Sequence, residues 1–139
     1  MPTLAIIAVY LAVYGYDKIT GQPPEKWVDA LLNRPMVELA AIYLTIFILA
    51  PFSEEIVFRG VLLNVFKTSR TWTTWAGAIA IGLFFAYIHQ QYDNASTLVE
   101  MMAIACIFAW ARMRSGGLLL PMLLHSLSEF IAVMLARIG

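Results

Sequence analysis

The chain has 139 residues, of which 61% are hydrophobic and only 13% are charged, and its formal net charge at pH 7 is zero. A soluble domain of this size has about a quarter of its residues charged, so the composition favours an integral membrane protein. Zero net charge argues against a nucleic-acid partner, and the single cysteine, Cys106, excludes a disulfide within the chain. We therefore expect the bilayer itself to be the main environment of this protein.

The N-terminal part predicts a short membrane helix followed by a helix in the membrane interface. Residues 2–14 form the first apolar stretch, which gives about 20 Å of helix against roughly 30 Å of hydrocarbon. It lacks a basic segment and a cleavage site, so we expect a retained helix rather than a signal peptide. Residues 15–35 predict a short interfacial helix, with an ordinary amphipathic connector as the alternative. The apolar side chains on one face of that helix are Trp27, Val28, Leu31 and Leu32.

Four further apolar stretches follow, at residues 36–66, 72–88, 98–110 and 118–138. The first is too long for one straight crossing and contains Pro51, where we expect a kink or a break. Thr97 and Glu100 have the spacing of a capping box at the start of the third. We predict an all-α fold, a polytopic transmembrane bundle of about five membrane helices plus the short interfacial helix, in a single domain of residues 1–139.

The positive charges are divided equally between the two sides of the predicted bundle. One side holds Lys67, Arg70, Arg112 and Arg114, and the other holds Lys18, Lys26, Arg34 and Arg137. This balance leaves the orientation in the membrane open. The short loops of the first group favour placing it inside the cell.

Three charged residues follow Pro51 within an otherwise apolar stretch, namely Glu54, Glu55 and Arg59. A charged side chain at the centre of a membrane helix costs roughly 2.5–3.5 kcal/mol, so such residues face the bundle interior, pair or line a wet cavity. Glu55 and Arg59 are four apart and predict an ion pair on one helical face. Glu54 points about 100° away and is available for another role. A water-exposed helix end after Pro51 is the alternative.

Both histidines of the chain also fall on apolar stretches. His89 follows residues 72–88, and His125 lies inside the last stretch, four residues before Glu129. A lone histidine on such a helix is usually a hydrogen-bonded core residue, but two histidines and three acids on membrane segments indicate a functional cluster. Glu38 and Glu100 lie in the first turns of their stretches, where the helix dipole favours an acid, and we interpret them as structural.

Three short motifs group these polar residues. The segment SEEIVFR contains the motif EExxxR, formed by Glu54, Glu55 and Arg59. The segment FAYIH contains FxxxH, formed by Phe85 and His89. The segment HSLSE lies at the position of a third motif, HxxxN or HxxxD, and supplies His125 and Glu129. In this order, on three predicted membrane helices, the motifs resemble those of the CAAX protease and bacteriocin-processing (Abi) family of intramembrane peptidases. The resemblance covers residues 36–139. EExxxR alone is weak, whereas three motifs at these spacings are specific.

The resemblance implies an intramembrane endopeptidase in which Glu54 and His89 activate a water molecule for attack on a peptide bond. It also implies that His125 and the residue at position 129 stabilise the oxyanion. The supporting residues would be Glu55, Arg59 and Phe85. The implied substrate is a membrane-anchored peptide or a lipidated protein, and we expect the cell (inner) membrane of a prokaryote. No residue indicates a prenyl pocket or an oligomeric state.

Position 129 departs from the family pattern, because Glu129 replaces the expected Asn or Asp. An ionised Glu only accepts hydrogen bonds and would repel an oxyanion. We favour the interpretation that Glu129 orients His125. The alternatives are a protonated Glu129 that donates, and a catalytically inactive family member that acts as a membrane binding or immunity factor.

The same residues raise the question of a metal cofactor. Glu54, His89 and His125 would make a nitrogen–oxygen ligand set for zinc. The HExxH motif of zinc peptidases is absent, and the family is treated as glutamate-dependent, so we expect no metal. A zinc-dependent version of the same peptidase is the alternative. A proton-coupled carrier is disfavoured because the short chain contains no inverted repeat.

Overall fold

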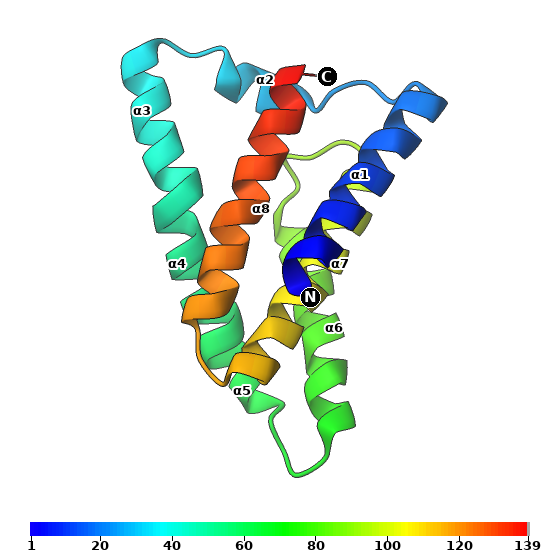
Figure 1. Cartoon of the computed structure of the whole chain (residues 1–139), viewed down its shortest axis with the longest axis vertical. Coiled ribbons are helices and arrows are strands. Elements are labelled where there is room, and N and C mark those ends of the chain that lie inside the picture. The colour runs from blue at the N-terminus through cyan, green and yellow to red at the C-terminus, as the bar shows by residue number, and fades with distance from the viewer. Residues whose placement is uncertain (139) are drawn as a thin grey trace.

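The computed structural model describes residues 1–138, which form a bundle of helices without any strand (Figure 1). Among these residues, five helical spans are long and apolar enough to cross a membrane, as predicted. They are α1 (Pro2–Thr20), a composite span (Met36–Val65), α6 (Thr71–Ile88), α7 (Ala95–Ser115) and α8 (Leu119–Ile138). The predicted short helix is α2 (Lys26–Leu32), which lies at the upper end of the bundle in Figure 1, beside the end of α8.

The composite span runs through Pro51 without a break. It contains three α-helical parts joined by two π-helical segments, in the order α3 (Met36–Leu44), η1 (Thr45–Leu49), α4 (Ala50–Glu55), η2 (Ile56–Leu62) and α5 (Leu63–Val65). A break at Pro51, one of the two predicted outcomes, does not occur because Pro51 lies in the first turn of α4 and follows the wider turns of η1. The Ser53 hydroxyl donates to the Leu49 carbonyl over 2.8 Å and satisfies an acceptor of this irregular turn.

α1 is longer than the apolar stretch that predicted it. It continues beyond Tyr14 to Thr20 and ends at Gly21, which has the left-handed conformation (φ 69°) common at helix ends. Lys18 does not end the helix, because it lies in the last turn, where a cation complements the helix dipole. Its ammonium group also lies 5.4 Å from the centre of the Tyr14 ring.

α7 is likewise longer than predicted, and its start is built differently. The helix begins at Ala95, so Thr97 is not its N-cap residue and the predicted capping box is wrong. The Thr97 hydroxyl instead donates to the carboxylate of Glu25, just before α2, over 2.6 Å. The start of α7 is therefore fixed by a distant part of the chain.

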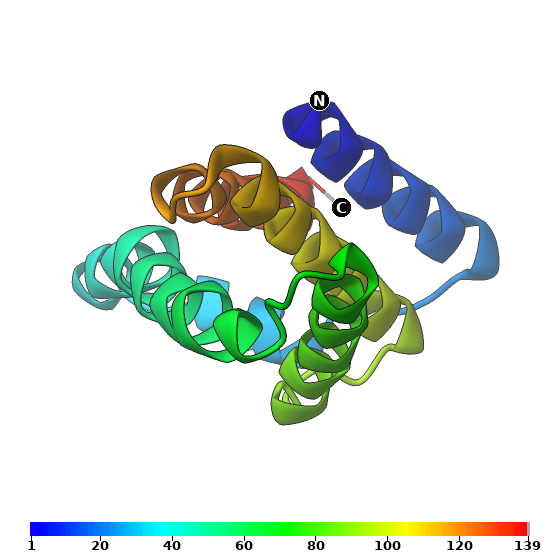
Figure 2. The same cartoon turned by 90° about the horizontal axis from the view of Figure 1, so that it is seen from below.

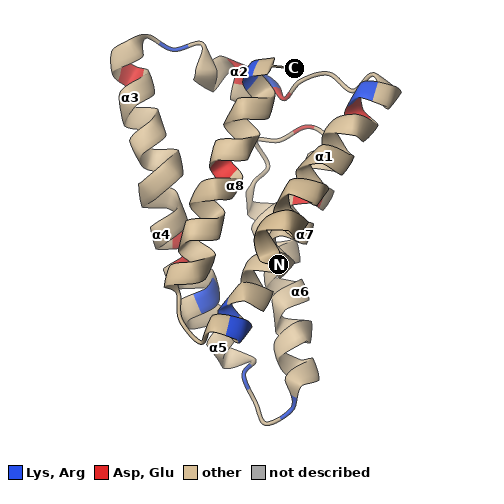
Figure 3. Ribbon diagram, viewed as in Figure 1, with Lys and Arg blue, Asp and Glu red and all other residues tan. Residues whose placement is uncertain are grey.

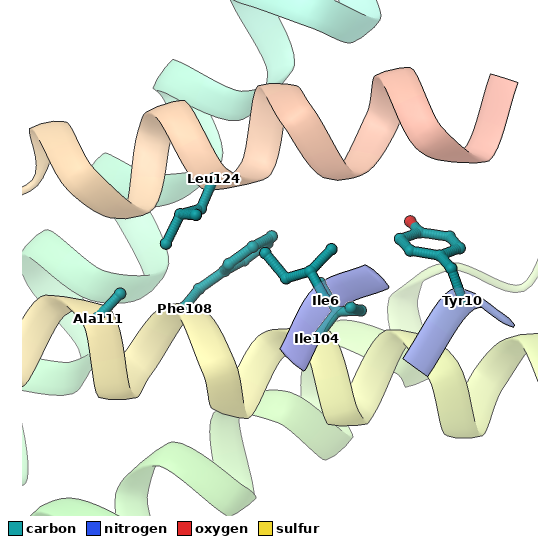
Figure 4. Packing of buried hydrophobic residues seen from close by; sticks show 6 residues of the cluster. All are labelled: Ile6, Tyr10, Ile104, Phe108, Ala111 and Leu124. Carbon is teal, nitrogen blue, oxygen red and sulfur yellow. The ribbon is translucent and has the colours of Figure 1, made fainter. Parts of the chain in front are cut away.

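α7 is the central helix of the bundle and packs against α1, α6 and α8 (Figure 2). A buried apolar cluster between α1, α7 and α8 contains Ile6, Tyr10, Ile104, Phe108, Ala111 and Leu124 (Figure 4). A second cluster joins the lower part of the composite span to α6 and α7, and contains Phe58, Leu63, Ala78, Ile81, Phe85 and Ala109. Aromatic residues of both clusters border the polar site described below.

Charge is distributed unevenly along the axis of the bundle (Figure 3). No Asp or Glu occurs in residues 56–92 or 101–128. The end that contains the α5–α6 and α7–α8 connections consequently carries cations without acids, namely Lys67, Arg70, Arg112 and Arg114. The positive-inside rule predicts that this end faces the cytoplasm, and this orientation stays a prediction.

Candidate active site

An ion pair between Glu55 and Arg59 lies in the interior of the bundle. The Arg59 Nη1 donates to Glu55 Oε1 over 2.9 Å, as the spacing of four residues predicts. Glu55 is 0% exposed and Arg59 is 2% exposed. Charges at this depth are tolerated only when they are paired and hydrogen-bonded. The pair therefore lets the composite span keep two charged residues away from both lipid and water.

Arg59 also contacts α6 and α7. Its Nη2 donates to the backbone carbonyl of Ala105 over 3.0 Å. Its guanidinium carbon lies between 5.3 and 5.9 Å from the centres of three rings, those of Phe58, Phe85 and Phe108. Cations within about 6 Å of an aromatic ring are attracted to its face, most strongly where water is excluded. Arg59 thus connects the composite span to the two neighbouring helices.

The His125 ring is held by Glu55 and Phe108. His125 Nδ1 lies 3.0 Å from Glu55 Oε1, and the imidazole stacks on Phe108 with ring centres 4.8 Å apart. Because the Glu55 carboxylate also receives the Arg59 hydrogen bond, it acts as an acceptor, and we assign the donated hydrogen to Nδ1. The contact joins residues 70 positions apart and fixes the plane of the ring.

The other nitrogen of His125 faces two more carboxylates. Nε2 lies 3.8 Å from Glu54 Oε2 and 3.6 Å from Glu129 Oε1, which is longer than a direct hydrogen bond. The side chains of Glu54 and Glu129 are 27% and 35% exposed, whereas that of His125 is 5% exposed. The Nε2 side is therefore the accessible side of the cluster.

Glu129 does not hold the position expected of a carboxylate that orients His125 from behind. Glu55 makes that contact, at Nδ1, while Glu129 lies near Nε2 on the same side as Glu54. The spacing of four residues correctly places Glu129 beside His125. It does not reveal which ring nitrogen Glu129 approaches, because that depends on the carboxylate supplied by another helix.

His89, at the end of α6, joins the cluster through Phe85. Its Nδ1 lies 2.6 Å from the Phe85 carbonyl oxygen. A carbonyl only accepts, so Nδ1 carries the hydrogen and Nε2 of the neutral ring is an acceptor. The Phe85 ring contacts both imidazoles, with ring centres 4.3 Å from His89 and 6.3 Å from His125. The FxxxH motif thus places one phenyl ring against both histidines.

The residues named for the zinc-dependent alternative, Glu54, His89 and His125, are not arranged as a metal site. Within residues 1–138, no three His, Cys, Asp or Glu side chains are arranged to hold a metal ion. Glu54 Oε2 and His125 Nε2 lie 3.8 Å apart, and the Phe85 ring lies between the rings of His89 and His125 in contact with both. The donor set therefore does not fit zinc as it stands.

Sequence reasoning missed two contributions from α7. Phe108 stacks on His125 and also lies against Arg59, and the Ala105 carbonyl accepts a hydrogen bond from Arg59. The spacing of three residues puts both on one face of the helix. In the sequence alone, however, two apolar residues three positions apart cannot be told from ordinary residues of the hydrophobic core.

The fold and this site together define a class of protein, a polytopic membrane helix bundle with a buried Glu–Arg–His network that opens toward two further carboxylates. Residues 36–131 match the model of the family described as type II CAAX prenyl endopeptidase Rce1-like. The chain belongs to this Rce1-like family, and the resemblance carried by its three motifs is confirmed.

The chain is also similar to a protein of Escherichia coli described as an uncharacterized 24.3 kDa protein. The two are 43% identical over 122 residues, which make up 87% of this chain and 56% of the relative. The chain therefore spans a little over half the length of the curated relative it matches. No solved structure matches the chain.

Proposed function

We propose that the chain carries the core of an intramembrane endopeptidase in which Glu54 is the general base. The observation that carries the proposal is the approach of Glu54 Oε2 to His125 Nε2, 3.8 Å apart, on the accessible side of a ring anchored by Glu55. Membership of the Rce1-like family supports the class of reaction. The test is to replace Glu54 by Gln and measure cleavage of a membrane-anchored peptide.

In the proposed reaction, Glu54 removes a proton from a water molecule as the water oxygen attacks the carbonyl carbon of the peptide bond. The same proton then passes to the leaving nitrogen, so that the C–N bond breaks and an amine and a carboxylic acid are released, and the acid finally gives its proton to the amine. His89 aligns the water through Nε2, which is free to accept because Nδ1 donates to the Phe85 carbonyl. This route uses side chains of the chain alone and needs no metal ion.

His125 stabilises the negative charge that develops on the carbonyl oxygen. Its Nδ1 donates to Glu55, and its Nε2 is the atom directed toward the accessible side. Nε2 donates to the oxyanion only when the ring is an imidazolium, with a hydrogen on both nitrogens, and His125 acts in this form in the proposed reaction. A preoriented donor is most effective where water is excluded, because it needs no rearrangement during the reaction. Glu55 supports this role by fixing the ring plane, as the orienting acid does in other histidine-based sites.

The surroundings of Glu54 limit the substrate to chains that are themselves in the membrane. Its neighbours along the composite span are apolar and exposed, namely Phe52 (40%), Ile56 (49%) and Val57 (49%). In a bilayer such side chains lie in hydrocarbon, so a peptide reaches Glu54 only if a lipid or an apolar segment anchors it. Prenylated C-terminal peptides, named in the family's description, are one member of this class.

Glu129 offers a test of the oxyanion role of His125. Its Oε1 lies 3.6 Å from Nε2, close enough to compete with the oxyanion for the same hydrogen. We expect Glu129→Asn to raise kcat, by at most about 100-fold, because the amide removes the competing charge and adds a donor. We expect Glu129→Ala to remain within about 10-fold of wild type, since it adds no donor. The measurement is kcat of both variants on one peptide. A lower kcat for the Asn variant than for the Ala variant would contradict the proposed competition.

A further inference from the structure

The segment before α2 is bound to the start of α7, next to His89. The Glu25 carboxylate accepts three hydrogen bonds there, from the backbone N–H of Asp93 (2.9 Å), the backbone N–H of Asn94 (3.0 Å) and the hydroxyl of Thr97 (2.6 Å). The Asn94 side-chain amide also donates, to the Pro23 carbonyl over 2.9 Å. Four hydrogen bonds, all donated by residues 93–97, therefore join two segments that are distant in the sequence.

Glu25 holds the two residues that lead into α7, namely Asp93 and the N-cap residue Asn94. The first N–H groups of a helix lack partners within it. Asn94 occupies the N-cap position of α7, but its side chain makes no capping hydrogen bond. Glu25 accepts the N–H groups of Asn94 and of Asp93 before it, and it places a negative charge near the end of the helix where the dipole is positive. The start of α7 thus depends on a residue that belongs to neither α6 nor α7.

The same contact reaches His89 through two aromatic rings. Trp27 packs edge-on against Tyr92, with ring centres 5.8 Å apart, and Tyr92 lies within 24° of parallel to His89 at 6.4 Å. Burial raises the pKa of the Tyr92 phenol, so this ring is neutral at neutral pH. Since His89 is the first residue after α6, the short connection to α7 decides how its ring is held.

We infer that Glu25 is a positioning residue for His89. Together with Trp27, it holds the connection of residues 89–94 so that the His89 ring stays against Phe85 and Tyr92. The catalytic consequence rests on the proposed function, in which His89 aligns the attacking water. Glu25 and Trp27 lie outside residues 36–131, so the match to the family does not account for them.

The experiment uses the fact that the chain contains only two histidines. The full chain is labelled with 15N-histidine, and the imidazole NMR signals are compared between wild type, Glu25→Gln and Asp29→Asn. The Asp29 variant is the matched control, because it makes the same acid-to-amide change on an exposed residue of α2 whose carboxylate accepts a local hydrogen bond from Asn33. We expect Glu25→Gln to move the His89 signal and to leave the His125 signal in place, while Asp29→Asn moves neither. Thr97→Val, which removes one of the three hydrogen bonds, should move the His89 signal in the same direction by a smaller amount.

Activity provides the second readout. Glu25→Gln should lower kcat by about 10- to 100-fold with little change in KM, because a displaced catalytic group slows the reaction step rather than binding. An unchanged His89 signal in both Glu25→Gln and Thr97→Val would overturn the inference. If Glu25→Gln fails to fold, Thr97→Val alone decides the question. Absence of cleavage by the wild-type chain would overturn the proposed function and leave the NMR comparison as a separate test of positioning.

Discussion

Replacing Glu54 by Gln is expected to lower the rate of peptide cleavage by about 1000-fold or more and to leave the fold intact. General bases contribute roughly 100- to 10,000-fold to catalysis, and an amide cannot take a proton from water. The fold should survive, because the Glu54 side chain is 27% exposed and its nearest charged partner, His125, is 3.8 Å away. The measurement is single-site cleavage of a membrane-anchored peptide by purified protein in lipid vesicles.

Glu38→Gln is the control for this change. Glu38 lies on the same span, near its other end, and its ion pair with Arg34 at 3.7 Å is exposed. The control should therefore cleave at the wild-type rate. Equal activity of wild type and Glu54→Gln would show that Glu54 is not the base. It would favour the alternative of a family member that acts by binding.

The largest effect on stability is expected for Glu55→Gln. This change leaves the Arg59 charge without a counter-ion at a site where its side chain is 2% exposed. Removing one partner of a fully buried ion pair lowers the free energy of unfolding by about 3–5 kcal/mol. Unfolding in detergent, followed by circular dichroism, measures the difference from wild type.

The same chain contains a matched control for the ion pair. Arg34 and Glu38 have the same spacing of four residues, but their side chains are 57% and 55% exposed. An exposed pair of this kind contributes about 0–1 kcal/mol, so Glu38→Gln should scarcely change the stability. A double variant, Glu55→Gln with Arg59→Met, should recover much of the loss, because it also removes the unpaired charge. A loss in Glu55→Gln no larger than that in Glu38→Gln would contradict a buried ion pair.

Much of the fold followed from the pattern of apolar residues. The five spans are apolar enough to lie in the hydrocarbon of a bilayer, so local composition alone predicts them. Their ends depended on other contacts. α1 extends to Thr20 because Lys18 is stable in a last turn, and the composite span passes Pro51 because π-helical turns absorb the missing hydrogen bond. Both features depend on the groups that surround Lys18 and Pro51 in space, which the sequence pattern does not show.

The site shows the same division between local and distant information. The Glu55–Arg59 pair and the neighbourhood of His125 and Glu129 are set by spacing within one helix, and the sequence predicted both contacts. The bond between Glu55 and His125 joins two helices, and it changes the interpretation of Glu129. Spacing carries no information on how the helices rotate against each other. For the same reason, the sequence does not indicate that Glu25 forms three hydrogen bonds to the start of α7.

In the proposed reaction, Glu54 activates a water molecule for direct attack on the peptide bond without a metal ion. Its most direct test is a single-turnover reaction of the wild-type chain in vesicles with H2 18O and a strong metal chelator, followed by mass spectrometry of the products. We predict that cleavage proceeds and that the new carboxylate carries one 18O atom after this first turnover. A first-turnover carboxylate without 18O would show that an oxygen of the protein attacks the substrate. Cleavage that the chelator abolishes and zinc restores would show that a metal ion is required, and either result would contradict the account.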